Sequence, residues 1–135
     1  MRFVDTSWWA AWAVPKERKH EQAREQSLRE GSRSRWLTTN LVLGECFTLL
    51  NVKYGHKAAA SFVDVLESQV ENDNLAIARV SEEQEVAAWK WLRKHNERTY
   101  SFVDATSFRV MKDKRLVEAL AFDGDFAAAG FVEVR

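Results

Sequence analysis

Residues 2–12 have the sequence RFVDTSWWAAW, in which a short apolar run ends at an acid and an aromatic segment follows at once. The run Arg2–Asp5 predicts a buried β-strand. Ser7 belongs to the residue types favoured at the N-terminal cap of a helix. A short helix is therefore expected to start there and to carry three tryptophans: Trp8, Trp9 and Trp12. The acid, Asp5, is thus placed at the carboxyl end of a strand.

The rest of the chain continues this alternation of short apolar runs with amphipathic segments. Four further strands are predicted at residues 36–38, 75–80, 116–122 and 131–134. Helices are predicted between them, over residues 16–30, 39–54, 56–69 and 81–95, from residue 101 onward, and from residue 123 to residue 130. Such alternation indicates an α/β fold, with a parallel sheet covered on both faces and one domain over residues 1–135.

The bulk composition restricts the class of protein. Apolar residues make up 46% of the chain, and 20 basic residues balance 20 acidic ones. Zero net charge argues against a general nucleic-acid coat protein but leaves room for an enzyme with a local basic patch. Cys46 is the sole cysteine, so no intrachain disulfide is expected. With no signal-peptide pattern and no apolar run near the roughly 20 residues of a membrane span, we expect a soluble, cytoplasmic protein.

Three acids are predicted to meet at one edge of the sheet. Asp5 ends the first strand, Asp123 ends the fourth, and Asp104 lies in the first turn of its helix. In open parallel α/β sheets, ligands bind beyond the carboxyl ends of the strands, near the point where the strand order reverses. Each acid alone also fits a structural role, Asp104 as a helix cap and Asp123 as a turn residue.

Glu45 lies in a conspicuously apolar stretch, residues 41–50, with the sequence LVLGECFTLL. No Lys or Arg occurs between Trp36 and Val52 to pair with it. A carboxylate on an apolar helix face is costly unless it is paired or bound to a metal. We therefore expect Glu45 to be buried and to belong to the same site.

A divalent cation would account for such a group of acids. Carboxylates brought together repel one another and take up protons, and a cation removes that repulsion. Mg²⁺ and Mn²⁺ prefer oxygen ligands and keep water molecules for chemistry. Zinc is disfavoured, because the chain has one cysteine and its three histidines lack ligand spacing. The sequence thus predicts an acidic Mg²⁺ or Mn²⁺ site.

Several motifs resemble the PIN-domain family, and in particular the VapC-type toxins of toxin–antitoxin pairs. They are Val4-Asp5-Thr6, the Thr39-Asn40…Glu45 helix, residues 101–108 (SFVDATSF), and residues 123–131, which begin Asp-Gly-Asp-Phe and end Ala-Gly-Phe. Together they span the chain in order. The 101–108 block and the 123–131 segment are the more specific parts, whereas Asp-Thr after a strand is weak alone.

The resemblance implies a three-layer α/β/α domain whose five-stranded parallel sheet has the order 3-2-1-4-5. It also implies a Mg²⁺- or Mn²⁺-dependent endoribonuclease that hydrolyses RNA with a metal-activated water. Its partners would be an antitoxin and a second copy in a homodimer. Its catalytic, metal-binding acids would be Asp5, Glu45, Asp104 and Asp123.

Further residues have accessory roles in this prediction. Thr6, Ser107 and Asp125 are expected to support the acids. Phe122 departs from the family, which usually has a polar residue there, and this weakens the prediction for Asp123. A basic stretch is a candidate RNA-binding surface or an ordinary solvated segment: Lys16, Arg18, Lys19, Arg24, Arg29, Arg33 and Arg35.

The tryptophans allow two interpretations. At least one of Trp8, Trp9 and Trp12 is expected in the core, and the others could stack on RNA or bind a partner. Trp89 and Trp91 are not expected to both face inward from one helix. Two other functions compete with the nuclease, namely a phosphate-receiver domain and a non-catalytic PIN-like binding module. The receiver domain is disfavoured, because Thr6 and Ser7 follow Asp5 where that class has a second acid.

Overall fold

The structure is a computed structural model that describes residues 1–31 and 35–135. Strands and helices alternate along the described chain, as predicted. The elements are β1 (Arg2–Val4), α1 (Thr6–Ala13), α2 (His20–Glu30), β2 (Trp36–Thr39), α3 (Asn40–Tyr54), α4 (His56–Glu71), β3 (Leu75–Ala78), α5 (Glu82–Lys94), α6 (Phe102–Asp113), β4 (Glu118–Leu120), α7 (Asp125–Ala128) and β5 (Val132–Glu133).

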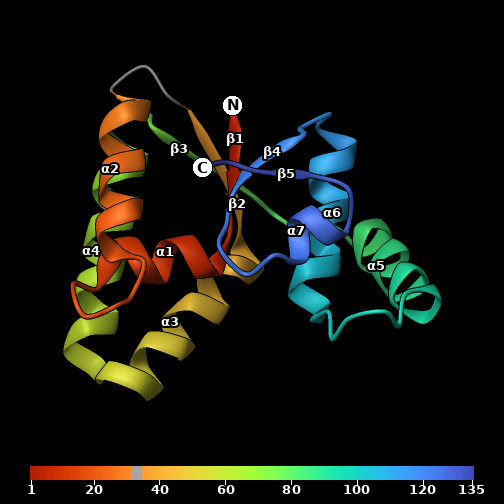
Figure 1. The fold of residues 1–135 in the computed structure, drawn as a ribbon, viewed down its shortest axis with the longest axis horizontal. Coiled ribbons are helices and arrows are strands. Elements are labelled where there is room, and N and C mark those ends of the chain that lie inside the picture. The colour runs from red at the N-terminus through yellow and green to blue at the C-terminus, as the bar shows by residue number, and fades with distance from the viewer. Residues whose placement is uncertain (32–34) are drawn as a thin grey trace.

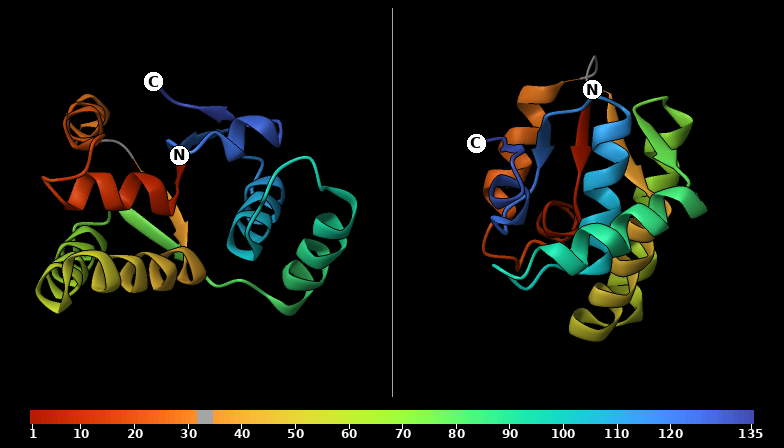
Figure 2. Two further views of the ribbon diagram at one scale, coloured as in Figure 1. Left: turned by 60° about the horizontal axis from the view of Figure 1, so that its bottom comes forward. Right: turned by 90° about the vertical axis from the view of Figure 1, so that its right-hand side faces the viewer.

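All strand pairs in the described chain are parallel, in the order β3-β2-β1-β4-β5. Helices α1–α4 lie on one side of the sheet and α5–α7 on the other (Figure 1; Figure 2). The predicted three-layer α/β/α architecture and strand order are confirmed. The chain runs outward from β1 to β3, then returns to the other side of β1 for β4. The carboxyl ends of β1 and β4 therefore flank the point where the strand order reverses.

Aromatic side chains fill the core on both sides of the sheet. The rings of Trp8, Trp9, Trp12 and Trp36 pack with centroids between 5.1 and 6.0 Å apart. Trp8 and Trp9 are fully buried, which confirms the expected core role. Burial of a large apolar side chain stabilises the fold by about 1.5–3 kcal/mol. This cluster therefore anchors α1, and with it the end of β1, to β2.

The second aromatic cluster lies between α6, α7 and β5. Phe126 of α7 packs edge-on against Phe108 of α6 at 4.9 Å and near Phe131 at 6.4 Å. On α5, Trp91 packs on Phe108, whereas Trp89 is 55% exposed, so the prediction that these two tryptophans differ is confirmed. The cluster fixes α7, and hence the loop that precedes it, on the sheet.

Several local predictions need correction. Asp5, not Ser7, caps α1, because its carboxylate accepts from the Ser7 backbone N–H. Helix α2 begins at His20 rather than residue 16, and residues 16–19 form a loop after Pro15. Strands β3, β4 and β5 are shorter than predicted, since pairing stops where the chain turns into loops. No helix of the described residues is long and apolar enough to cross a membrane.

Candidate metal centre

Three carboxylates converge where β1 and β4 end. Asp5 follows β1, and its backbone N–H donates to Leu120 O at 3.1 Å, which ties the two strand ends together. Asp123 lies in the loop after β4, and Asp104 lies in the first turn of α6. One oxygen from each of these three acids lies within 4.8 Å of the others. The convergence predicted for them is therefore present, and we call this group the acidic cluster.

Asp5 is buried, at 2% exposure, and Ser7 holds its carboxylate. Its Oδ2 accepts from the backbone N–H of Ser7 at 3.2 Å and from Ser7 Oγ at 2.8 Å. Ser7 Oγ in turn accepts from the backbone N–H of Phe122 at 3.0 Å. Burial, followed by the charges of Asp123 and Asp104, raises the pKa of Asp5 to about 8. A charge at this position is thus strongly disfavoured unless a cation compensates it.

Asp104 is buried as well, at 7% exposure, and is held by a capping box. Ser101 N–H donates to Asp104 Oδ2 at 3.0 Å, while Asp104 N–H donates to Ser101 Oγ at 2.9 Å. Burial first, then repulsion from Asp123 and Asp125, raises the pKa of Asp104 to about 6. The sequence left two roles open for Asp104, a helix cap and a residue of the acidic site. In the structure Asp104 belongs both to the capping box of α6 and to the acidic cluster.

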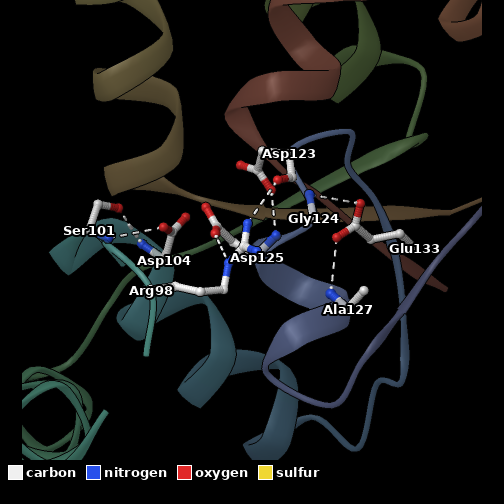
Figure 3. A network of polar contacts seen from close by, with 8 residues as sticks. All are labelled: Arg98, Ser101, Asp104, Asp123, Gly124, Asp125, Ala127 and Glu133. Atoms are coloured by element: carbon white, nitrogen blue, oxygen red, sulfur yellow. Dashed lines mark hydrogen bonds and ion pairs between the residues drawn. The ribbon is translucent and has the colours of Figure 1, made fainter. Parts of the chain in front are cut away.

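Asp123 is the exposed member of the cluster and belongs to a loop. The backbone N–H of Asp125 donates to its Oδ1 at 3.0 Å. Glu133 on β5 holds the same loop, because its buried carboxylate accepts from Gly124 N–H at 3.2 Å and from Ala127 N–H at 3.0 Å (Figure 3). Desolvation of the carboxyl, followed by repulsion from Asp125 and Glu133, raises the pKa of Asp123.

Glu45 does not have the surroundings that its sequence predicted. It is half-buried, and Thr6 Oγ1 donates to its Oε1 at 2.8 Å. Its helix neighbour Leu49 is 42% exposed, so the apolar face of α3 points partly to solvent rather than into the core. The prediction of a buried Glu45 is therefore wrong. Glu45 lies beside the acidic cluster through Thr6, which follows Asp5 directly.

Ser107 and Asp125 are the other two residues predicted to support the acids. Ser107, one helical turn after Asp104, is fully buried, and its Oγ has no hydrogen-bond partner among the described residues. Asp125 accepts from Arg98 Nε at 2.8 Å. A buried hydroxyl without a partner is unusual, and no hydrogen bond among the described residues connects Ser107 to the three acids.

The predicted basic residues are scattered. Lys16 and Arg18 are exposed in the α1–α2 loop, and Lys19 lies over the Phe122 ring at 5.9 Å, next to Asp123. Arg35 precedes β2, at the opposite edge of the sheet from the acids, and pairs with Asp73 at 3.8 Å. Arg24 and Arg29 are exposed on α2, and Arg33 lies outside the described residues.

Three residues that hold the cluster were missed by sequence reasoning. They are Ser7, which joins Asp5 to the end of β4, Glu133, which anchors the Asp123 loop, and Arg98, which contacts the same loop from the α5–α6 loop. Glu133 did carry a signal, because it is an acid inside the apolar run FVEV. Arg98 carried none, since its partners are distant in sequence.

The donor set suits a hard divalent cation. Three carboxylates within 4.8 Å offer oxygen ligands. Burial, with a smaller contribution from the neighbouring acids, raises the pKa of Asp5 and of Asp104, so a charge on either carboxyl is disfavoured without a cation. No histidine or cysteine belongs to this group among the described residues. Burial raises the pKa of the nearby Cys46 thiol to about 12, so this thiol is protonated at neutral pH.

Comparison with known proteins agrees with this architecture. The model of the PIN-domain family matches residues 2–132. The chain belongs to the PIN-domain family. This excludes the phosphate-receiver alternative.

Two similar relatives, from Mycobacterium tuberculosis strains CDC 1551 / Oshkosh and ATCC 25618 / H37Rv, carry the name 23S rRNA-specific endonuclease VapC20. Each is 47% identical over 135 residues, covering 100% of this chain and 98% of the relative. A crystal structure of VapC20 from that species, described as a sarcin–ricin loop cleaving toxin, superposes with a TM-score of 0.91. It is 44% identical and covers 100% of this chain and 99% of that structure. The predicted resemblance to VapC-type PIN domains is thereby confirmed.

Proposed function

We propose that this PIN domain, over residues 1–135, is a Mg²⁺- or Mn²⁺-dependent endoribonuclease that cleaves the sarcin–ricin loop of 23S ribosomal RNA. The observation that carries the proposal is the acidic cluster at the carboxyl ends of β1 and β4. The relatives that match along the full chain and act on 23S rRNA support the substrate. Because ribosomes lie in the cytoplasm, the proposal includes a cytoplasmic location.

Asp5, Asp104 and Asp123 would hold the cation, because their oxygens are the ones brought together. When bound, Mg²⁺ or Mn²⁺ would activate the attacking water and stabilise charge on the departing 3′ oxygen. The chain orients these ligands through the Asp5 and Asp104 caps and through the Glu133-anchored loop. Cleavage in this sense leaves 5′-phosphate and 3′-hydroxyl ends.

Glu45 has a different role in this proposal from the direct ligand that its sequence suggested. It is half-buried, with one oxygen bonded to Thr6 Oγ1, and it is not among the three acids within 4.8 Å of one another. A carboxylate that is partly solvated and next to the cluster is suited to accept a proton from the attacking water. Thr6 fixes its orientation.

We also propose that the chain is the toxin of a toxin–antitoxin pair and that it binds an antitoxin and a second copy of itself. The name of the VapC20 structure supports the toxin role. Exposed apolar side chains beside the cluster support a protein partner. Leu49 and Val52 on α3 border a groove that Phe102 and Val103 also line. A non-catalytic binding module has less support, because it would have no need to gather acids that repel one another.

The test is cleavage of a synthetic sarcin–ricin hairpin of 23S rRNA, with Mg²⁺ or Mn²⁺ and with EDTA. We expect one metal-dependent cut with a 5′-phosphate on the downstream fragment, mapped by primer extension. A hairpin with the loop sequence scrambled is the control for specificity. An intact hairpin in the presence of either metal, or a cut that survives EDTA, would contradict the proposal.

A further inference from the structure

Arg98 lies at the acidic cluster without belonging to it. It sits in the loop between α5 and α6, and its guanidinium contacts the Asp123 loop twice. Nε donates to Asp125 Oδ1 at 2.8 Å, and Nη2 donates to the backbone oxygen of Asp123 at 3.2 Å. Figure 3 shows the guanidinium of Arg98 against the carboxylate of Asp125, which in this view lies between the side chains of Asp104 and Asp123. Its ion pair is with Asp125, two residues after the cluster acid Asp123.

The guanidinium retains unused donors at this position. Of its five N–H groups, two are engaged by the contacts to Asp125 and Asp123. The other three have no protein partner in the described chain, and the side chain is 42% exposed. Arg is the side chain whose planar fork best matches phosphate oxygens. These three N–H groups are therefore available to a ligand, on a side chain that also contacts the backbone of Asp123.

Asp125 has the complementary role of holding this arginine. Its side chain is only 17% exposed, and its backbone N–H donates to Asp123 Oδ1. Asp125 thus contacts a cluster acid through its backbone while its carboxylate is engaged by Arg98. A long side chain that is already oriented loses less entropy when it binds a ligand. The pair connects the α5–α6 loop to the start of α7, next to Asp123.

We propose that Arg98 binds a backbone phosphate of the RNA at the acidic cluster and that Asp125 positions Arg98 for this contact. The inference rests on the proposed nuclease function. Arg98 is thus a substrate-binding residue, and Asp125 is a positioning residue rather than a ligand of the cation. It also explains how a chain of zero net charge brings a polyanion to a site rich in carboxylates.

The chain offers a matched control in the pair Arg109–Asp113. Arg109 is 43% exposed and its Nε lies 3.1 Å from Asp113, so geometry and exposure resemble those of Arg98. This pair lies within α6 and does not touch the cluster. Exposed ion pairs of this kind contribute little to stability, so R98A and R109A are both expected to lower the Tm by less than about 5 °C.

The experiment measures binding of a fluorescent sarcin–ricin hairpin in the Asp5→Asn background, where cleavage is expected to be lost, over a series of salt concentrations. R98A is expected to weaken RNA binding about tenfold, as for one charge-assisted contact. It should also reduce the slope of log affinity against log salt by about 0.7–0.9, the loss of one phosphate contact. R109A should change neither quantity, and R98K should restore part of the affinity.

Asp125→Asn separates positioning from general electrostatics. If Asp125 merely repels RNA, neutralising it strengthens RNA binding. If Asp125 positions Arg98, RNA binding does not improve in D125N. In that case kcat/KM of the otherwise wild-type enzyme also falls about threefold or more. Tighter binding by D125N, or R98A indistinguishable from R109A, would overturn the inference. So would a loss of Mn²⁺ affinity in D125N equal to that in D104N, measured by thermal shift. If wild type leaves the hairpin intact, the nuclease function itself fails, and the inference fails with it.

Discussion

Asp5 and Asp104 are held quite differently from Asp123, although all three acids belong to one cluster. The first two are buried, each bonded at the start of a helix that aromatic side chains pack onto the sheet. Asp123 is exposed in a loop, and its position depends on contacts made by distant residues, Glu133 and Arg98. Two ligands are thus fixed by the core, whereas the third is held by polar contacts near the surface.

The three acids therefore differ in how much each destabilises the metal-free folded protein. A buried acid with a raised pKa destabilises the folded protein at neutral pH when no cation is present. Asp5 carries most of that cost, because burial together with two neighbouring acids raises its pKa to about 8. Asp123 carries less, since it faces solvent. We infer that the buried pair sets the geometry of the site.

The largest effect is expected on the cleavage rate, when the buried Asp104 and the exposed Asp123 are each replaced. Asp104→Asn should lower the rate of hairpin cleavage by about 10³-fold, and Asp123→Asn by about 10- to 100-fold, because a loop ligand is more readily replaced by water. Asn keeps the shape at both positions and the cap of α6. Cleavage rates at saturating Mg²⁺ give the comparison. Equal losses for the two variants would show that burial does not rank the ligands.

We call Asp5 and Asp104 the buried half of the site. Their positions were predictable from sequence because they depend on residues close by in the chain. Asp5 follows an apolar strand, and Asp104 lies in a helix whose first residues form a cap, so both positions follow from neighbours within a few residues. The strand order places the two helix starts at one edge. The structure corrects only the assignment of the α1 cap to Ser7.

We call Asp123 and its loop the loop half of the site, and its position was not predictable in the same way. Its supports, Arg98 and Glu133, come from other elements, and no local pattern connects them to Asp123. The prediction of a buried Glu45 is wrong for a related reason, because the apolar face of α3 borders an open groove with Leu49 and Val52 instead of the core. Whether an apolar face meets the core or a partner is decided by tertiary packing, which periodicity does not specify.

The next effect concerns pH and should appear for the buried acids. The pKa of Asp5 is about 8 in the folded protein against an ordinary value of 3.8, so the folded state binds more protons between these values. The contribution of Asp5 to metal-free stability is therefore most favourable below about pH 4 and is lost as the pH rises to about 8. Mg²⁺ or Mn²⁺ should raise the Tm more at pH 8 than at pH 5, where protons compete for the ligands.

Asp5→Asn is the control for this pH effect. Asn retains a cap oxygen but carries no charge, so the metal-free variant should exceed wild type in Tm at pH 8 by on the order of 10 °C and match it near pH 4. Thermal unfolding in EDTA across this pH range makes the measurement. A wild-type Tm that is independent of pH between 4 and 8 would contradict the raised pKa.

A smaller effect is expected for Glu45, which belongs to neither half. Glu45→Gln should lower the cleavage rate about 10²-fold, as for loss of a proton acceptor, and leave Mn²⁺ affinity close to that of wild type. Gln preserves the bond from Thr6 Oγ1, so the orientation of the side chain is retained. Activity is compared with Mn²⁺-induced thermal shift. A parallel loss of Mn²⁺ affinity would instead make Glu45 a ligand, as its sequence first suggested.

The smallest effect tests the link between the two halves. Ser7 Oγ donates to Asp5 Oδ2 and accepts from Phe122 N–H, so one hydroxyl joins the buried acid to the residue before Asp123. Ser7→Ala leaves that N–H without its partner, which should cost about 1–2 kcal/mol of stability and lower cleavage about tenfold. The bond to Ser7 also lowers the pKa of Asp5 against its other surroundings, so its loss should raise that pKa further and shift the pH–rate profile upward.

Ser81→Ala is the matched control for Ser7→Ala. Ser81 caps α5 by accepting from Gln84 N–H at 3.1 Å, and its loss should cost about 1 kcal/mol, but it does not contact the acidic cluster. Both variants should therefore be destabilised, while only Ser7→Ala loses activity and changes its pH–rate profile. If the two variants cleave the hairpin equally well, the buried half and the loop half act independently. Glu133 and Arg98 would then hold the loop of Asp123 without help from Ser7.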